Sequence, residues 1–178
     1  ERPLAALPWY LRPLFWLQRR RWGQVLLPAL TWARVPSYYL ALLHFYAAIE
    51  RRRSPLEPAL RALVQTRISQ INHCAFCIDL NAMIASERSG SLDKAMAVDG
   101  WRDSPAFSAR ERLALEYAEA VTEIRVTDAL SGRVKAEFGE DGLVELTGLA
   151  AFQNMSAKFN SALDIPAQGF CQLPRKQE

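Results

Sequence analysis

The sequence predicts an all-α fold, and three observations lead to this prediction. Almost every segment places apolar residues at the three- and four-residue spacing of an amphipathic helix. No run alternates polar and β-branched residues as a half-buried strand does. Two segments, SPLE at residues 54–57 and SARE at residues 108–111, match a helix capping box. The chain has 178 residues, of which 50% are hydrophobic, and this indicates a globular protein with one core.

The first fifty residues predict a series of short helices with many aromatic side chains. Prolines interrupt this stretch repeatedly, and the apolar spacing from Tyr38 to Ile49 predicts an amphipathic helix at its end. We expect residues 1–50 to form an arm that covers the core or a partner subunit, in preference to lying on a membrane surface. The prolines and aromatic residues concerned are Pro8, Pro13, Pro28, Pro36, Trp9, Tyr10, Phe15, Trp16, Trp22 and Trp32.

A core domain is predicted over residues 51–170, with residues 171–178 as a C-terminal tail. Its first helix is expected to begin with Ser54 as N-cap, Pro55 at the first helical position and Glu57 closing the capping box. From there an apolar stripe runs toward two cysteines, so this helix leads the chain into the cysteine motif. The stripe consists of Leu56, Leu60, Leu63, Val64, Ile68 and Ile71.

Three more helices are predicted in the second half of the chain. Ser108 and Glu111 form a capping box that opens the first, which has Leu113, Leu115, Tyr117, Ala120 and Val121 on its apolar face. Thr127 is expected to cap a short helix that ends at Gly139. Residues 143–163 then predict a long, mostly apolar helix, which the following Ile-Pro pair stops.

Charge and composition argue against several classes of function. The net charge is only +3, and the arginine triplet at residues 51–53 follows a helical pattern whose end it would solvate, so no nucleic-acid partner is expected. No apolar run reaches the roughly 18 uncharged residues that a membrane span requires. The N-terminal stretch has its arginines after the apolar residues and does not resemble a secretory signal. With three cysteines, an odd number, the chain is expected in the reducing cytoplasm.

The segment NHCAFCIDLNAM, residues 72–83, contains the main candidate for chemistry. A C-x-x-C at the first turn of a helix brings two sulfurs within disulfide reach, and the free N–H groups there stabilise a thiolate. Asn72 is a candidate N-cap, and the helix is expected to run to Gly90. Cys74 and Cys77 are therefore candidate redox residues. His73 either lowers the pKa of the adjacent thiol or is an exposed loop residue.

Two other interpretations of the cysteines remain open. A structural zinc site needs four ligands, and Cys171 and His44 are isolated in the sequence, so neither a metal nor another cofactor is expected. Inert core cysteines are the second interpretation, which the polar neighbours of the motif make weaker. Nothing in the sequence assigns a role to Cys171.

The run LVQTRISQINHCAFCIDLNAMIA resembles the signature of the alkyl hydroperoxidase D-like (AhpD-like), carboxymuconolactone decarboxylase family. The segments FSARERLALEYAEAVTEI and VELTGLAAFQNMSAKFNSALDIP also resemble that family, so the likeness covers residues 51–170. It implies a multi-helix bundle with the C-x-x-C at the N-terminal end of a core helix. It also implies homo-oligomers that share central helices, and thiol peroxidase activity without a cofactor.

In the redox branch of this family the second cysteine, matching Cys77, attacks the peroxide, and the first, matching Cys74, resolves the product as a disulfide. A dithiol reductant then resets the pair. A Glu and a His that relay the proton in that branch correspond to Ala62 and Asn81 in this chain. Asn81, Gln65 and His73 are therefore possible supporting residues, although an amide can orient a group and cannot relay a proton.

The leading hypothesis from the sequence is an antioxidant oxidoreductase that reduces hydroperoxides or exchanges disulfides, with a weakened proton relay. The alternative is a non-catalytic oligomeric helical binding protein whose redox site has degenerated. A third hypothesis, the lactone decarboxylase branch, has the least support because His44 and His73 are the only histidines.

Overall fold

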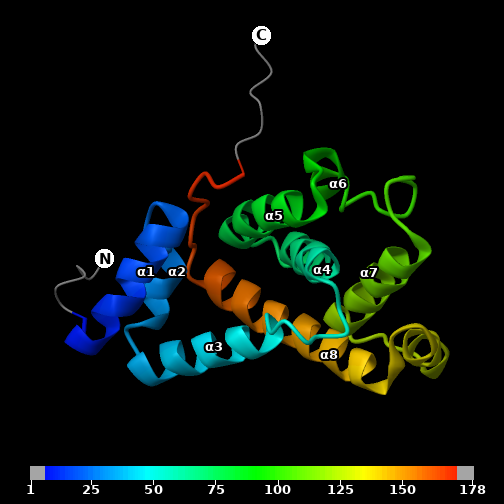
Figure 1. The fold of residues 1–178 in the computed structure, drawn as a ribbon, viewed down its shortest axis with the longest axis horizontal. Coiled ribbons are helices and arrows are strands. Elements are labelled where there is room, and N and C mark those ends of the chain that lie inside the picture. Colours follow the sequence, from blue (N-terminus) through cyan, green and yellow to red (C-terminus); the bar gives the residue numbers. More distant parts are fainter. Residues whose placement is uncertain (1–6, 172–178) are drawn as a thin grey trace, which may run out of the picture. The chain divides into compact units, whose positions relative to one another are not determined.

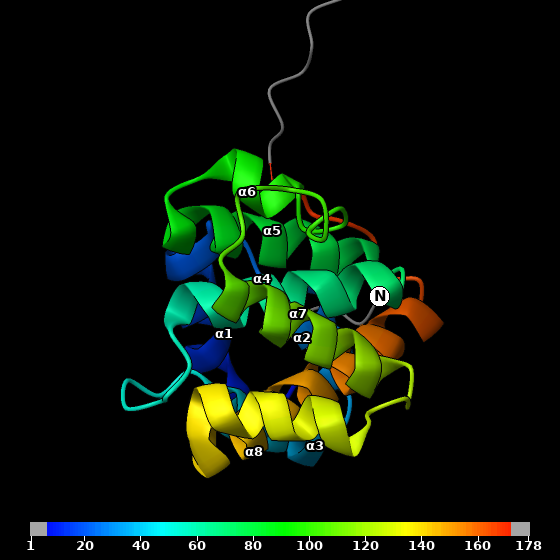
Figure 2. The same ribbon diagram turned by 90° about the vertical axis from the view of Figure 1, so that its right-hand side faces the viewer.

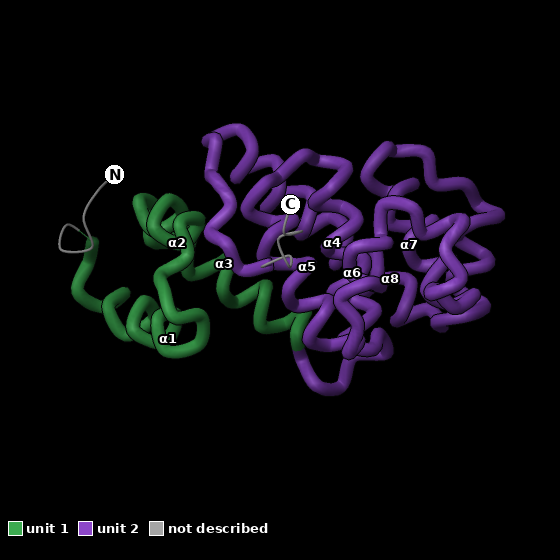
Figure 3. The backbone as a smooth tube through the Cα atoms, turned by 90° about the horizontal axis from the view of Figure 1, so that it is seen from above, with its two compact units in different colours: residues 1–50 green, residues 51–178 purple. Residues whose placement is uncertain are grey.

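The computed structural model describes residues 7–171, and every regular element within that range is a helix (Figure 1). The all-α prediction is therefore confirmed. Backbone contacts divide the chain into two compact units, Glu1–Glu50 and Arg51–Glu178 (Figure 3). Residues 1–6 of the expected arm and 172–178 of the expected tail lie outside the described residues.

From residue 7 onward, the first unit contains the short helices η2 (Trp9–Leu11), α1 (Arg12–Trp22), α2 (Leu27–Trp32) and α3 (Pro36–Ile49). Each of the three α-helices has a proline in its first two positions, where the missing N–H costs nothing. Phe15 of α1 stacks on Tyr39 of α3, with ring centroids 5.7 Å apart. Gln18 Nε2 donates to the Tyr39 hydroxyl at 2.9 Å. Burial raises the pKa of Tyr39 to about 12.

The second unit contains α4 (Pro58–Ile71), α5 (Ala75–Ser89), α6 (Leu92–Met96), α7 (Ala109–Thr122) and α8 (Asp128–Ala162). Helix α4 contacts α5, α7 and α8. Figures 1 and 2 both show α5 on one side of α4 and α8 on the other. The predicted apolar stripe of α4 explains this central place, because Leu60, Leu63, Val64 and Ile68 are all buried.

The start of α4 differs from the prediction. Its N-cap is Glu57 and its first residue Pro58, so the predicted Ser54 capping box is wrong. Pro58 forces Glu57 into an extended conformation (φ −59°, ψ 144°), which moves the helix start to the second proline. Ser54 Oγ instead accepts the Leu56 N–H at 3.1 Å and donates to Glu145 Oε2 at 2.6 Å.

The later helix boundaries are confirmed. Ser108 Oγ accepts the Glu111 N–H at 3.2 Å, and the Glu111 carboxylate accepts the Ser108 N–H at 2.8 Å. Thr127 Oγ1 accepts the Leu130 N–H at 3.2 Å. Gly139 (φ 77°, ψ 177°) interrupts α8, so the predicted short helix ends there and the long one follows. Helix α6, which was not among the helices predicted from the sequence, is capped by Ser91.

An ion cluster around the buried Glu119 carboxylate joins α4 to α7. Glu119 of α7 accepts hydrogen bonds from Arg67 Nε at 2.6 Å and Trp101 Nε1 at 2.9 Å, and it pairs with Arg102. Burial opposes ionisation of Glu119, but hydrogen bonds from Arg102, Trp101 and Arg67 outweigh that effect and lower its pKa. This cluster fixes α4, the helix that precedes the cysteine motif.

Candidate redox site

The cysteine motif lies at a tight junction between α4 and α5. Only residues 72–74 separate the two helices, and His73 has a left-handed conformation (φ 50°) that reverses the chain. The prediction that Asn72 caps α5 is wrong, because Asn72 terminates α4 and its Nδ2 donates to the Ile68 carbonyl at 2.9 Å. Cys74 is the N-cap of α5 instead. The C-x-x-C therefore lies at the N-terminal end of a core helix, as predicted.

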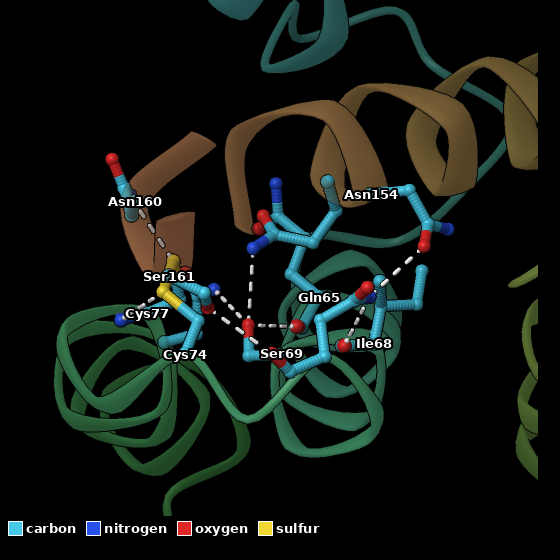
Figure 4. Close-up of a disulfide and its surroundings, with 11 residues drawn as sticks. Gln65, Ile68, Ser69, Cys74, Cys77, Asn154, Asn160 and Ser161 are labelled. Atoms are coloured by element: carbon cyan, nitrogen blue, oxygen red, sulfur yellow. Dashed lines mark hydrogen bonds between the residues drawn. A yellow bond between two sulfur atoms is a disulfide. The ribbon is translucent and has the colours of Figure 1, made fainter. Parts of the chain in front are cut away.

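Cys74 and Cys77 form a disulfide, with their Cα atoms 5.2 Å apart. Cys74 Sγ accepts the backbone N–H of Cys77 at 3.2 Å, as a capping side chain does at a helix N-terminus. Both residues are buried, since Cys74 is 1% and Cys77 3% exposed. Figure 4 shows the pair beneath the end of α8, with polar side chains around it.

A residue of α8 that sequence reasoning missed contacts the second sulfur. Asn160 Nδ2 donates to Cys77 Sγ at 3.2 Å (Figure 4). Asn160 is 1% exposed, which is unusual for an amide side chain. A polar residue within the apolar helix 143–163 was the signal available in the sequence, but nothing there indicated that this turn of α8 lies over α5.

An uncharged hydrogen-bond cluster centred on Ser69 lies beside the cysteines. Ser69 Oγ accepts from Asn81 Nδ2 and from Gln153 Nε2, both at 3.0 Å, and donates to the Gln65 carbonyl at 2.6 Å. The hydroxyl thus uses its donor and both acceptor positions. Asn81, the residue at the family's His position, bonds to Ser69, and Ala62, at the Glu position, is fully buried. Neither position has a group that carries a proton at neutral pH.

The remaining candidates lie away from the sulfurs or serve another contact. His73 is exposed. The Asp79 carboxylate accepts three backbone N–H groups, those of Gln168 at 2.8 Å, Phe170 at 3.0 Å and Cys171 at 2.7 Å. Asp79 thereby holds the C-terminal segment 168–171 against α5. Burial, with a smaller contribution from the Asp79 charge, raises the pKa of the Cys171 thiol.

Within residues 7–171, no three His, Cys, Asp or Glu side chains come together as a metal site would require. No helix in the same range is both long enough and apolar enough to cross a bilayer.

Comparison with known proteins gives the family. The profile of the Carboxymuconolactone decarboxylase family matches residues 36–120. The protein YnjA of Escherichia coli K12 is 51% identical over 177 residues, which are 98% of this chain and 97% of YnjA. The structure of a peroxidase-related protein with an alkylhydroperoxidase AhpD core, from Ralstonia eutropha JMP134, matches with a TM-score of 0.86 and 21% identity, over 95% of this chain and 91% of that one.

The debrominase Bmp8 has the same fold. Its structure without ligand matches with a TM-score of 0.80 and 19% identity, over 90% of this chain and 87% of that one. A further Bmp8 structure contains 2,3,4-tribromopyrrole. Proteins of this fold thus include peroxidase-related ones and a debrominase. From the C-x-x-C motif, the helical architecture and these matches, the chain belongs to the carboxymuconolactone decarboxylase family and has an AhpD-like fold.

Proposed function

We propose that this protein is a thiol-dependent reductase in which Cys77 and Cys74 deliver two electrons to a small hydroperoxide. The observation that supports the proposal is the bonded pair at the start of α5, where each sulfur accepts one N–H. Such donors stabilise negative charge on sulfur, and the thiolate is the form that reacts with peroxides.

The proposed reaction has three steps. The Cys77 thiolate attacks the terminal oxygen of a hydroperoxide ROOH, which cleaves the O–O bond, gives Cys77 sulfenic acid and releases RO⁻, which takes a proton from water as ROH. The Cys74 thiolate then attacks the Cys77 sulfur, which forms the disulfide and releases hydroxide, protonated to water. A dithiol reductant reduces this disulfide by thiol exchange and is itself oxidised.

Burial of the disulfide favours a small oxidant over a protein disulfide as the substrate. Exchange with a protein disulfide requires one of its sulfurs to approach Cys77 in line, and the 3% exposure of Cys77 leaves little room for that approach. A hydroperoxide needs to place only one oxygen against the sulfur. Since no acid–base residue occupies positions 62 and 81, we expect turnover slower by about 10²- to 10⁴-fold than with a complete relay.

The decisive experiment compares wild type with Cys77→Ser and Cys74→Ser. With tert-butyl hydroperoxide and dithiothreitol, wild type should turn over and Cys77→Ser should consume no peroxide. With the peroxide alone, Cys74→Ser should accumulate a sulfenic acid that dimedone traps. Peroxide consumption by Cys77→Ser at the wild-type rate would eliminate the proposal. If neither cysteine variant differs from an inactive wild type, the protein is the non-catalytic binding protein that is the alternative.

A brominated acceptor belongs in the same experiment because of the likeness to a debrominase. Reductive debromination uses the same two electrons: two thiols and R–Br give R–H, HBr and the disulfide. Release of bromide from 2,3,4-tribromopyrrole, with no peroxide consumption, would assign the site to the halogenated class instead.

Assembly into a homo-oligomer is also proposed, through α8. Val144 is 70% and Met155 45% exposed, and with Gly148 and Ala151 between them they form one apolar side of this helix. Such a face is typical of a contact between subunits. Light scattering should give a lower mass for the Val144→Glu, Met155→Lys double variant than for wild type, and an equal mass would contradict this contact.

A further inference from the structure

We propose that Asn160 is a catalytic residue, which stabilises negative charge on Cys77 Sγ by donating its Nδ2–H to the sulfur. The inference rests on the proposed function and deepens it. The group that stabilises the negative charge on Cys77 Sγ is then a side chain of α8, whereas positions 62 and 81, where the family has its proton relay, have none.

The hydrogen bonds of Asn160 point to function rather than packing. Within the described residues, its side chain makes one hydrogen bond, to Cys77 Sγ at 3.2 Å. Its Oδ1 is buried and accepts no hydrogen bond there. A buried amide with an unpartnered oxygen is less stable than an apolar residue of similar size, so packing alone does not account for an asparagine here. The hydrogen bond to Cys77 Sγ does account for it.

The backbone around Asn160 is firmly positioned at the end of α8. Its carbonyl accepts the N–H groups of Leu163 at 3.3 Å and Ile165 at 3.1 Å. The next residue, Ser161, donates its hydroxyl to the Asn72 carbonyl at 3.1 Å. Since Asn72 lies at the α4–α5 junction, this bond ties the end of α8 to the segment that contains Cys74. The amide is thus held over Cys77 before any substrate arrives.

The direction of the amide matches the charge that develops during turnover. A disulfide sulfur can only accept a hydrogen bond, and a thiolate accepts one far more strongly. Cys74 already has the backbone N–H of the first helical turn, whereas Cys77 Sγ accepts its hydrogen bond, among residues 7–171, from Asn160. Asn160 therefore offsets the advantage that the helix end gives to Cys74, and makes Cys77 the attacking sulfur.

In the described part of the chain, the charged groups near the site do not stabilise negative charge on Cys77 Sγ. On α5, the Asp79 carboxylate is occupied by the N–H groups of residues 168, 170 and 171. Before α5, His73 is exposed. On α4, the Ser69 side chain, which accepts from Asn81 and donates to the Gln65 carbonyl, does not titrate.

The test titrates one thiol at a time in the full chain. In a Cys74→Ser background, Asn160→Leu should raise the Cys77 pKa, measured by pH-dependent alkylation, by about one to two pKa units, because a hydrogen bond to a charged group is lost. Asn160→Asp should raise it further, since a carboxylate repels the thiolate. In a Cys77→Ser background, Asn160→Leu should leave the Cys74 pKa unchanged.

The matched control is Asn154→Leu, six residues earlier on α8. Its amide donates to Thr122 and the Ala150 carbonyl and accepts from Asn72, so the Asn154→Leu variant should leave the Cys77 pKa unchanged.

A second measurement needs no variant: in reduced wild type, the NMR signals of the Asn160 side-chain NH2 should shift as Cys77 titrates. An unchanged Cys77 pKa in Asn160→Leu, or NH2 signals that ignore the titration, would overturn the inference. Peroxide consumption by Cys77→Ser overturns the proposed function separately.

Discussion

Asn160 Nδ2 lies 3.2 Å from Cys77 Sγ, although 83 residues separate the two in sequence. The redox motif of α5 is therefore completed by the last turn of α8. Beside this disulfide, the neutral side chains of Asn81 and Gln153 both donate to Ser69 Oγ (Figure 4). Among the described residues, these three neutral side chains can orient a group by hydrogen bonding but do not transfer protons at neutral pH.

Asn81→His should increase the rate of hydroperoxide reduction. Position 81 is one turn after Cys77 on the same face of α5, where an imidazole can accept the thiol proton. We expect kcat/KM at pH 7 to rise by about 10- to 100-fold, less than a complete relay would give, because position 62 still has no acid–base group. The rate should also become dependent on pH near the pKa of histidine. Met83→His, two residues further along and off this face, is the control, and equal rates in both variants would refute the explanation.

Asp79→Ala should release the C-terminal segment. Three backbone N–H groups would lose their charged acceptor, so we expect hydrogen exchange at residues 168, 170 and 171 to accelerate by about 10- to 100-fold. Alkylation of Cys171 should also become faster, because its pKa is raised partly by Asp79. Asp79→Asn keeps one oxygen acceptor and should show a smaller change. Unaltered exchange in Asp79→Ala would mean that other contacts hold this segment.

Sequence patterns predicted the core helices well where local interactions determine the start or the end of a helix. The Ser108 capping box, the Thr127 cap and the break at Gly139 each depend on residues within four positions of one another. The prediction failed at Ser54, where two nearby prolines allowed two helix starts. It failed again at Asn72, because the short connection uses that residue to end α4.

The candidate site was predictable only in part. The C-x-x-C spacing and its place at a helix end are local features, and the structure has both. The partners of the site are not local: Asn160 reaches Cys77, and Gln153 reaches Ser69, from a helix more than eighty residues away. Without the packing of α8 on α4 and α5, an asparagine in an apolar helix has no assigned neighbour.

Glu119→Gln should destabilise the protein by about 2 to 4 kcal/mol, because the guanidinium and indole donors would then face a neutral amide. Solvent screens the half-exposed Arg102, so its ion pair contributes less to this loss. The folded-state pKa of Glu119 is lowered from the ordinary 4.5, so its contribution is complete above pH 4.5 and disappears as the pH falls through the folded pKa. Chemical denaturation should therefore show the gap between wild type and variant narrowing below pH 4.5.

Glu140→Gln is the control for this experiment. Glu140 pairs with Lys135 on the surface, and its removal should leave the unfolding midpoint unchanged. A gap between wild type and Glu119→Gln that stays constant from pH 7 to pH 3 would contradict the role of the Glu119 charge.

The same substitution at two glycines of α8 should change stability in opposite directions. Gly139 has φ 77° and ψ 177°, a region that side chains rarely adopt, whereas Gly132 lies in regular helix. At both positions a Cβ would meet no atom within 4 Å, so steric contact with neighbours is not involved. Gly139→Ala should therefore cost about 1 to 3 kcal/mol through backbone strain alone. Gly132→Ala should stabilise by about 1 kcal/mol, because alanine has the higher helix propensity. Urea unfolding of both variants measures these changes, and a stabilising Gly139→Ala would mean that α8 runs through residue 139 without a break.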